Sequence, residues 1–291
     1  MAAEFAVESL GNRQLNALDP SQEHDRHWLN FYNNSEKDAL VRWNRELRPR
    51  LCPASPPLLP GLRASCSGSE HDLSSVLEIA TGGGRWTAFL ANISAHVVGV
   101  DLNRVGIETV AAPRFKGFPH VEVHCNDATP NLLPMVANRS ITFAFTYDSM
   151  VHFPPDAVGS YLAEVSRVLS PGGTGFFHHS DLVECSTIGL RPGYFGHGHF
   201  ARAMDASLDA KRLGQCGVPV KSFKNPLGRN LMTCAEFARR AKSHGLEVTQ
   251  QERIPWGTWY SSPANATDPR SPLRNRSHFI FDCLTTLRLP R

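Results

Sequence analysis

Apolar and polar positions alternate along the chain in a pattern that predicts strands and helices in turn. Short apolar runs, typical of buried strands, occur at 75–80, 97–102, 121–125, 141–147, 174–179, 247–254 and 279–287. Helical spacing of apolar residues occurs between them, at 85–93, 105–112, 156–169 and 235–244. Strands that alternate with amphipathic helices predict a parallel sheet with helical crossovers. The chain is therefore expected to adopt an α/β fold.

Two further segments differ from this pattern. Residues 1–50 are polar with aromatic anchors, and 36–51 has the apolar spacing of a helix. Four prolines between 53 and 60 indicate a linker. Glycines and aromatic residues mixed within 182–230 are typical of a lid over a substrate. We therefore divide the chain into an N-terminal helical cap with its linker, 1–60, and a domain, 61–291, with a lid insertion at about 182–230.

Composition restricts the function classes. Of 291 residues, 41% are hydrophobic and 20% charged, as in globular proteins. The net charge of +3 is too small to imply a nucleic-acid partner, and no apolar run is long enough to predict a membrane span. Seven cysteines without regular spacing predict reduced thiols in a cytoplasmic protein. An excess of Lys and Arg between 191 and 242 would either attract an anionic substrate or form a solvated face.

The most informative stretch is Val76–Thr87, where an apolar run leads into three consecutive glycines and then a helical pattern. Glycine lets the backbone adopt positive φ and lets a ligand approach closely. A strand, a glycine-rich turn and a helix start form a nucleotide or cofactor cradle. Asp101 ends the next apolar run. Its separation from Glu78 along the sequence is about that at which an acidic residue binds ribose hydroxyls in such folds.

The order of these motifs resembles that of class I S-adenosylmethionine-dependent methyltransferases. Glu78-x-Ala80-x-Gly82-x-Gly84 matches their glycine motif with one Gly-to-Ala change. The match continues through Asp101, Asn126-Asp127, Tyr147-Asp148 and the turn at Leu169–Gly173. The resemblance implies a Rossmann-like sheet of seven mostly parallel strands with an antiparallel last strand. It also implies S-adenosylmethionine as the cofactor.

The resemblance further implies where the cofactor binds. Its amino-acid portion would lie against the loop Ala80–Gly84, and Asp101 would accept the ribose hydroxyls. Asp127 would accept the adenine amine, although it could instead be a turn residue. The cofactor residues expected in this way are Glu78, Ala80, Thr81, Gly82, Gly84, Trp86, Asp101, Leu102, Asn126, Asp127, Ala128 and Tyr147.

Several segments are similar to a narrower group of bacterial-type small-molecule methyltransferases. The shared segments are Gly84–Thr87, Asp148–His152, Phe176–Ser180 and Asp282-Cys283. This similarity implies a small-molecule acceptor such as a sugar or another polyol, with methyl transfer to a hydroxyl. The basic segment and Arg229 add an anion as the other candidate. Nitrogen or sulfur as the acceptor atom, and a catalytically silent cofactor-binding protein, are the alternatives.

Transfer to a hydroxyl requires a base, and histidine suits this task near neutral pH. His152, His178 and His179 follow strands whose carboxyl ends would face the substrate. Because side chains alternate along a strand, His178 and His179 cannot both face the pocket. Each histidine could instead have a structural role. Asp148 completes the catalytic set, and the expected substrate residues are Met150, Asp181, Tyr194 and Arg229. No metal site is assigned.

Two other enzyme classes fit less well. A nicotinamide-dependent dehydrogenase would carry Gly-x-Gly-x-x-Gly directly after the first strand, and this chain does not. A nucleic-acid amino-methyltransferase is the second alternative. It would carry Asp/Asn-Pro-Pro-aromatic after the fourth strand, where this chain has Tyr147–Met150. The oligomeric state is not predicted.

Overall fold

The computed structural model describes residues 36–60, 63–126, 132–181, 232–255 and 280–291. The predicted lid and four expected site residues lie outside this part of the chain: Asp127, Ala128, Tyr194 and Arg229.

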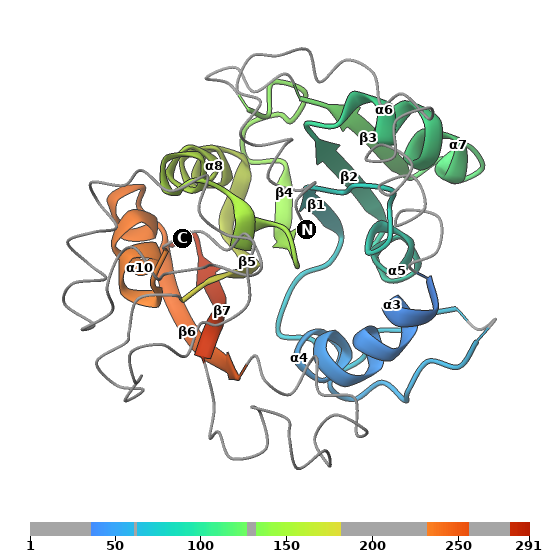
Figure 1. The fold of residues 1–291 in the computed structure, drawn as a ribbon, viewed down its shortest axis with the longest axis horizontal. Helices are drawn as coiled ribbons and strands as arrows, with labels where there is room; N and C mark the ends of the chain where they lie inside the picture. Colours follow the sequence, from blue (N-terminus) through green and yellow to red (C-terminus); the bar gives the residue numbers. More distant parts are fainter. Residues whose placement is uncertain (1–35, 61–62, 127–131, 182–231, 256–279) are drawn as a thin grey trace, which may run out of the picture.

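Seven strands form one sheet in the order β3-β2-β1-β4-β5-β7-β6 (Figure 1). They are β1 (Ser75–Ile79), β2 (His96–Asp101), β3 (Val121–Cys125), β4 (Ile141–Thr146), β5 (Leu169–Ser180), β6 (Glu247–Pro255) and β7 (Ile280–Arg288). The first five run parallel, and β7 is antiparallel to both β5 and β6. The predicted Rossmann-like fold is confirmed. Its strand order reverses between β1 and β4, where such sheets bind ligands.

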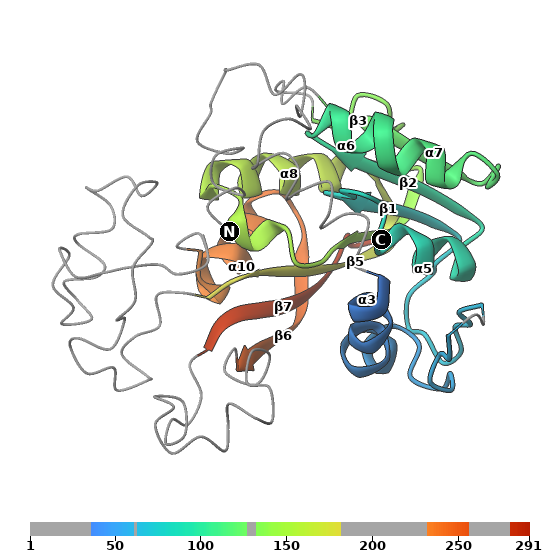
Figure 2. The same cartoon turned by 45° about the vertical axis from the view of Figure 1, so that its right-hand side comes forward.

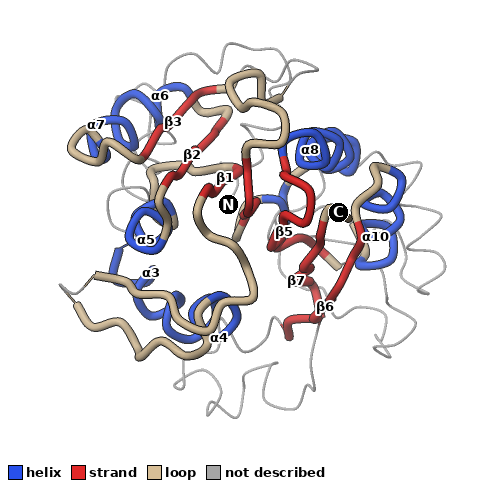
Figure 3. Tube along the Cα trace, turned by 180° about the vertical axis from the view of Figure 1, so that it is seen from behind, coloured by secondary structure: helices blue, strands red, loops and turns tan. Residues whose placement is uncertain are grey.

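The helices flank this sheet (Figure 3). They are α3 (Glu36–Arg42), α4 (Arg48–Leu51), α5 (Thr87–Ile93), α6 (Arg104–Gly106), α7 (Ala112–Phe115), α8 (Pro155–Val168) and α10 (Cys234–Ser243). A π-helical turn, η1 (Trp43–Leu47), joins α3 to α4, and another, η2 (Ile107–Ala111), joins α6 to α7. A 3-10 turn, η3 (Met150–His152), precedes α8.

Each face of the sheet has its own apolar core. One core joins the sheet to α8 and α10 through residues such as Leu162, Val165 and Phe237. The other joins it to the N-terminal helices and α5 through Trp43, Leu47 and Leu90. Figure 2 shows α3 and α8 on opposite sides of the strands. Residues of the segment 36–51 thus pack in the core on the face of the sheet opposite α8.

The alternation of side chains on β5 divides its two histidines between these cores. Phe176 and His178 face the N-terminal helices, where the His178 ring lies 4.8 Å from that of Tyr147. Phe177 and His179 face α10, where the His179 ring stacks on Phe237 at 3.9 Å. The prediction that the two histidines point to opposite faces is confirmed.

Two local predictions need correction. Residues Ser170–Gly173, expected to form a turn, belong to β5. Gly172 keeps a bend there with φ of +82°, and its N–H donates to the carbonyl of Leu289 at the chain end. This hydrogen bond continues the antiparallel pairing of β5 with β7. For this reason β5 begins earlier than the Pro-Gly-Gly sequence suggests.

The expectation of reduced thiols is also wrong for four of the seven cysteines. Disulfides join Cys52 to Cys66 and Cys234 to Cys283. The first bond ties the end of α4 to the loop before β1, and the second ties the start of α10 to β7. Residues distant in sequence meet only after folding, so cysteine spacing could not reveal either pair. Reduced thiols, from which a cytoplasmic location was expected, are thus absent at these four cysteines.

Candidate active site

The glycine-rich loop leaves β1 through three left-handed residues. Ala80, Gly82 and Gly84 have φ values of +64°, +56° and +80°. A Cβ at Gly84 would collide with the ring of Phe115, so this position has no room for a side chain. Ala80 carries a Cβ in a conformation that costs L-residues about 1–2 kcal/mol. The Gly-to-Ala change in the motif is therefore a point of backbone strain.

Glu78, the acidic residue of the motif, lies inside the protein. It is 1% exposed, and it accepts a hydrogen bond from the Thr87 hydroxyl at the start of α5. Burial raises the pKa of Glu78 to about 8, against the opposing effect of its hydrogen bonds. Glu78 thus connects β1 to α5 beneath the glycine-rich loop and supports that loop.

Asp101 lies at the end of β2 and faces the glycine-rich loop. Its Oδ2 accepts the N–H of Gly82 at 2.7 Å, and its Oδ1 accepts the N–H of Asn103 at 2.7 Å. Burial raises the pKa of Asp101, and the backbone N–H donors oppose this rise. Each carboxylate oxygen has a second lone pair, so the residue can still accept a ribose hydroxyl.

In the described part of the chain, the buried polar atoms without a hydrogen-bond partner include Oγ1 of Thr81 within this loop and two atoms beside it. The two are Oδ1 of Asn126, which follows β3, and the indole nitrogen of Trp86, at the start of α5. The amide nitrogen of Asn126 is engaged, donating to the Tyr161 hydroxyl at 2.8 Å. Native proteins rarely leave such atoms unsatisfied, so each indicates a missing partner. An acceptor beside the loop fits the adenine amine, and the residues present fit S-adenosylmethionine.

Asp148 is the centre of a charged cluster after β4. Its Oδ2 accepts from Nη1 of Arg42 at 2.6 Å and from Nη2 of Arg85 at 3.1 Å. Burial alone would raise the pKa of Asp148, but the two guanidinium groups outweigh it and hold this pKa well below its usual range. Arg42 comes from α3 and Arg85 from the glycine-rich loop. The cluster therefore joins the cofactor loop to the end of β4.

Tyr147 extends this cluster towards the N-terminal helices. Its hydroxyl donates to Oε2 of Glu46 at 2.7 Å, and its ring meets that of Trp86 edge-on at 5.4 Å. The Arg42 guanidinium lies over both rings, 5.3 Å from Tyr147 and 5.5 Å from Trp86. Burial raises the pKa of Tyr147 well above 10, so its hydroxyl stays protonated at neutral pH.

His178 lies between the turn after β4 and β7. Its Nδ1 accepts the N–H of Asp148 at 3.0 Å, which places the ring proton on Nε2 because an amide can only donate. Nε2 is 3.1 Å from Oδ2 of Asp282, although its N–H is poorly aligned for a hydrogen bond. His178 and Asp282 are each 2% exposed. Both ring nitrogens therefore face protein groups.

His179 has the environment of a core residue. Its Nδ1 donates to the Ser180 carbonyl at 2.8 Å, so its Nε2 accepts from the Thr285 hydroxyl at 2.7 Å. Burial lowers the pKa of His179 to about 3, so it stays neutral. The histidine connects β5, β7 and α10 as part of the core.

The other described candidates differ in position. His152 is half-buried at the end of η3. The carbonyl of Val151, the residue before His152, accepts a hydrogen bond from the Ser180 hydroxyl. Met150 is fully buried in the core with α8. Asp181 is 1% exposed, and it accepts the N–H of Cys234 at the start of α10 at 2.9 Å. Leu102 is half-buried at the loop edge.

Sequence reasoning missed three residues of the cluster: Arg42, Glu46 and Arg85. Arg42 and Glu46 are one turn apart on the predicted N-terminal helix, and an ion-pair spacing was their only signal. Arg85 was expected to begin a helix and lies in the shared segment Gly84–Thr87, but no role was assigned to it. Their approach to Asp148 depends on how the N-terminal helices pack on the sheet.

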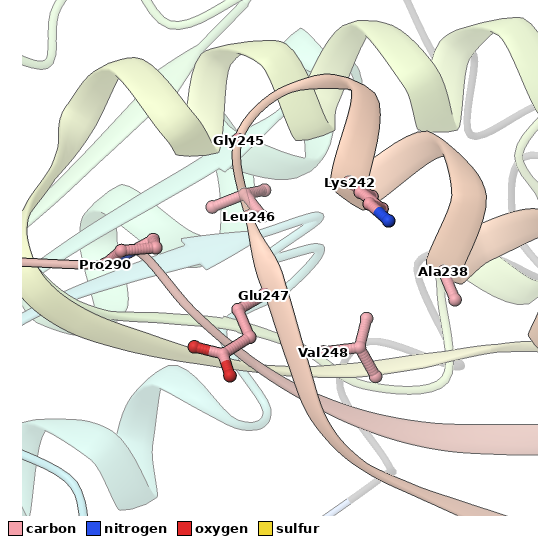
Figure 4. A pocket seen from close by; sticks show the side chains of 7 residues that line it. All are labelled: Ala238, Lys242, Gly245, Leu246, Glu247, Val248 and Pro290. Atoms are coloured by element: carbon pink, nitrogen blue, oxygen red, sulfur yellow. The ribbon is translucent and has the colours of Figure 1, made fainter.

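A hollow at the other end of the sheet is unrelated to this cluster (Figure 4). It has a volume of about 480 Å³ and lies between α10 and the start of β6. Ala238, Lys242, Leu246, Val248 and Pro290 are among its lining residues. Arg288 of β7 pairs with Thr174 of β5 on one side and with Glu247 of β6 on the other. The start of β6 therefore lies level with Thr174, on the amino side of β5. In such sheets ligands bind at the carboxyl side.

Within the described ranges, no three His, Cys, Asp or Glu side chains are grouped as a metal site would require. The helices in these ranges include none with the length and apolar character to cross a membrane.

Comparison with known proteins agrees with the geometry. Residues 76–173, about a third of the chain, match a family model described as a methyltransferase domain. The matched segment is similar to that family over less than half of the chain. It spans β1 to the start of β5 and therefore includes Glu78, Asp101 and Asp148. Together with the buried acceptor beside the loop, the match supports S-adenosylmethionine as the cofactor. A search of curated proteins found no match.

Solved structures match this chain at low sequence identity. A Pyrococcus horikoshii OT3 protein is 17% identical, with 93% of this chain and 99% of that chain covered and a TM-score of 0.51. An S-adenosylmethionine-dependent methyltransferase from Mesorhizobium loti is 16% identical, with 74% and 90% covered and a TM-score of 0.46. A geranyl diphosphate methyltransferase solved with S-adenosylmethionine is 14% identical, with 74% and 78% covered and a TM-score of 0.45.

Proposed function

We propose that this protein transfers the methyl group of S-adenosylmethionine to a hydroxyl of a small molecule, either an anion or a polyol. The observation that carries the proposal is the contact between Arg85 and Asp148. It joins the loop beside the cofactor site to the polar cluster that follows β4. Cofactor and acceptor would therefore meet where the carboxyl ends of β1, β4 and β5 converge.

The cofactor supplies the activated methyl group, so the protein chiefly has to orient the acceptor and exclude water. Trp86, Tyr147 and Arg42 form an aromatic and charged wall beside Asp148. The wall limits how an acceptor can approach. Asp148 would accept a hydrogen bond from an acceptor hydroxyl, since its guanidinium partners keep it ionised.

We propose His152 as the base that removes the proton of the acceptor hydroxyl. Among the three expected histidines, it is the one that solvent reaches. His178 is held by Asp148 and Asp282, and His179 is bonded at both ring nitrogens within the core. His178 would then support the site through Asp148. We propose no cellular compartment, because the disulfides remove the basis for a cytoplasmic one.

The test is direct transfer. The full-length protein is incubated with tritium-labelled S-adenosylmethionine and panels of sugars, hydroxy acids, amines and thiols, and the label is followed into product. We expect labelling of a hydroxyl compound, and loss of labelling in His152→Ala with cofactor affinity retained. Labelling of amines or thiols alone would contradict the hydroxyl assignment. Cofactor binding without transfer to any acceptor would identify a silent binding protein.

A further inference from the structure

Arg42 lies where the N-terminal helix changes its winding. The π-helical turn η1 begins at the next residue, and the N–H of Arg48 bonds to the carbonyl of Trp43, five residues back. Pro49 follows and cannot supply the N–H of a regular helix, which favours the wider turn. Such π turns are frequent at functional sites. The altered winding lies between Arg42 and the regular helix α4.

The Arg42 side chain is directed into the protein and is only 10% exposed. Besides Asp148, it contacts Oε2 of Glu46 through Nε at 3.3 Å. A buried guanidinium is costly unless it is paired and hydrogen-bonded. Two carboxylates and two aromatic faces meet this requirement, so the position of the Arg42 guanidinium is strongly determined.

Asp148 is held in a strained conformation that needs such support. Its φ is +65°, in the left-handed region that residues with a side chain rarely adopt. Strain of this kind persists only where surrounding contacts determine the backbone. The bonds from Arg42 and Arg85 supply these contacts. They therefore fix the direction of the Asp148 N–H as well as the carboxylate.

That N–H is the group that bonds Nδ1 of His178. The bond keeps the His178 proton on Nε2, opposite Asp282. Contacts thus run without interruption from the N-terminal helix through Asp148 and His178 to β7. The helix lies outside the segment that matches the methyltransferase domain, 76–173.

We propose that Arg42 is a positioning residue of the acceptor site: by holding the Asp148 turn, it sets the ring orientation and the proton position of His178. That this is the acceptor site rests on the proposed function, whereas the effect of Arg42 on the His178 ring can be measured without a substrate. The N-terminal helix then forms part of the working site.

The experiment is nitrogen NMR of the full chain labelled with ¹⁵N-histidine, because ring nitrogen shifts report which nitrogen carries the proton. His178→Gln assigns the His178 signals. Arg42→Gln is the test variant. Arg45→Gln is the matched control, since Arg45 also bonds Glu46 but is more than half exposed. Cofactor affinity is measured in parallel by calorimetry with S-adenosylhomocysteine.

In wild type and Arg45→Gln we expect His178 with its proton on Nε2 alone. In Arg42→Gln we expect a mixture of tautomers, with S-adenosylhomocysteine affinity within about threefold of wild type. Asp148→Asn should shift the same signals, and combining it with Arg42→Gln should add little, because residues that act through one contact are not additive. If Arg42→Gln unfolds, Arg42→Lys, which keeps the charge but not the fork, should give a partial shift.

An unchanged His178 tautomer in folded Arg42→Gln or Arg42→Lys would overturn the proposal, and so would an equal shift in Arg45→Gln. With an acceptor in hand, Arg42→Gln should slow transfer about 100-fold through misplacement of the site. Failure of transfer in wild type, with the tautomer change intact, would reject the proposed function and leave the positioning role supported.

Discussion

The cofactor side and the proposed acceptor side of this site are built in different ways. The cofactor side comes mainly from one stretch of the chain, in which β1, its glycine-rich loop and the end of β2 lie close in sequence and in space, and Asn126 after β3 adds a further polar group. The acceptor side combines Arg42, Asp148, His178 and Asp282, which come from four distant segments. A local motif can be recognised in the sequence because its residues follow one another closely. A cluster assembled by packing has no sequence pattern of this kind.

The two sides also treat their carboxylates differently. Glu78 on the cofactor side is buried without a guanidinium in hydrogen-bond contact, and its pKa rises to about 8. Asp148 on the acceptor side bonds two guanidinium groups, and its pKa falls well below the usual range. Burial therefore does not by itself set the charge of a carboxyl group. The charged groups and donors in contact with the carboxyl decide whether it ionises.

The largest expected effect tests Glu78. Because its folded pKa is raised, its contribution to stability is fully present below pH 4.5 and is lost as the pH rises through about 8. Glu78→Gln cannot ionise, so relative to wild type its free energy of unfolding should rise by about 4 kcal/mol between pH 5 and pH 9. Urea unfolding at three pH values measures this difference.

Glu108→Gln is the control for that series, since Glu108 is an exposed glutamate on η2. Its unfolding free energy should follow wild type at every pH. If Glu78→Gln also follows wild type, Glu78 does not carry the raised pKa. Cofactor affinity at pH 6 should be unchanged in Glu78→Gln, since the residue supports the loop from beneath.

The two neighbouring histidines of β5 give the next effect. His179→Ala removes a buried ring with two hydrogen bonds and a stacked partner, and should lower the unfolding free energy by about 3 kcal/mol. His178→Ala should be less destabilising but should reduce methyl transfer about 100-fold. Chemical denaturation and the tritium assay distinguish the two, and the reverse assignment of effects would refute this division of roles.

A smaller effect concerns Asp101 and affinity for S-adenosylhomocysteine. Asp101→Ala should weaken binding about 100-fold, because it removes both a charged acceptor for the ligand and the bond that holds Gly82. Calorimetry measures the change. Glu122→Gln, which removes an exposed carboxylate from neighbouring β3, should bind like wild type. Unchanged affinity in Asp101→Ala would overturn the cofactor assignment.

The smallest effect tests the strain at the start of the glycine-rich loop. Ala80→Gly should raise the free energy of unfolding by about 1 kcal/mol, since glycine adopts the left-handed conformation without a Cβ penalty. Thermal unfolding measures this gain, with Ala88→Gly in α5 as a contrast that should destabilise by a similar amount. A loss of stability at position 80 would show that the Ala80 methyl makes a packing contribution larger than the strain.

Much of the fold could be predicted because its signals are local. The strands of the sheet follow from short apolar runs, and the alternation rule correctly separated His178 from His179. The start of β5 was placed too late, because pairing with the chain end extends a strand through Pro-Gly-Gly. The disulfides were missed because their partners meet only in the folded chain.

By itself the sequence determined the parallel sheet and the glycine-rich loop, because each depends on neighbouring residues or on a fixed period, and its resemblance to a known family indicated the cofactor. Only the tertiary structure decided which polar groups work together. Packing of the N-terminal helices on the sheet brings Arg42 to Asp148, and the pairing of β5 with β7 brings Asp282 to His178. Charge and proton position depend on such contacts, and the contacts depend on the whole fold.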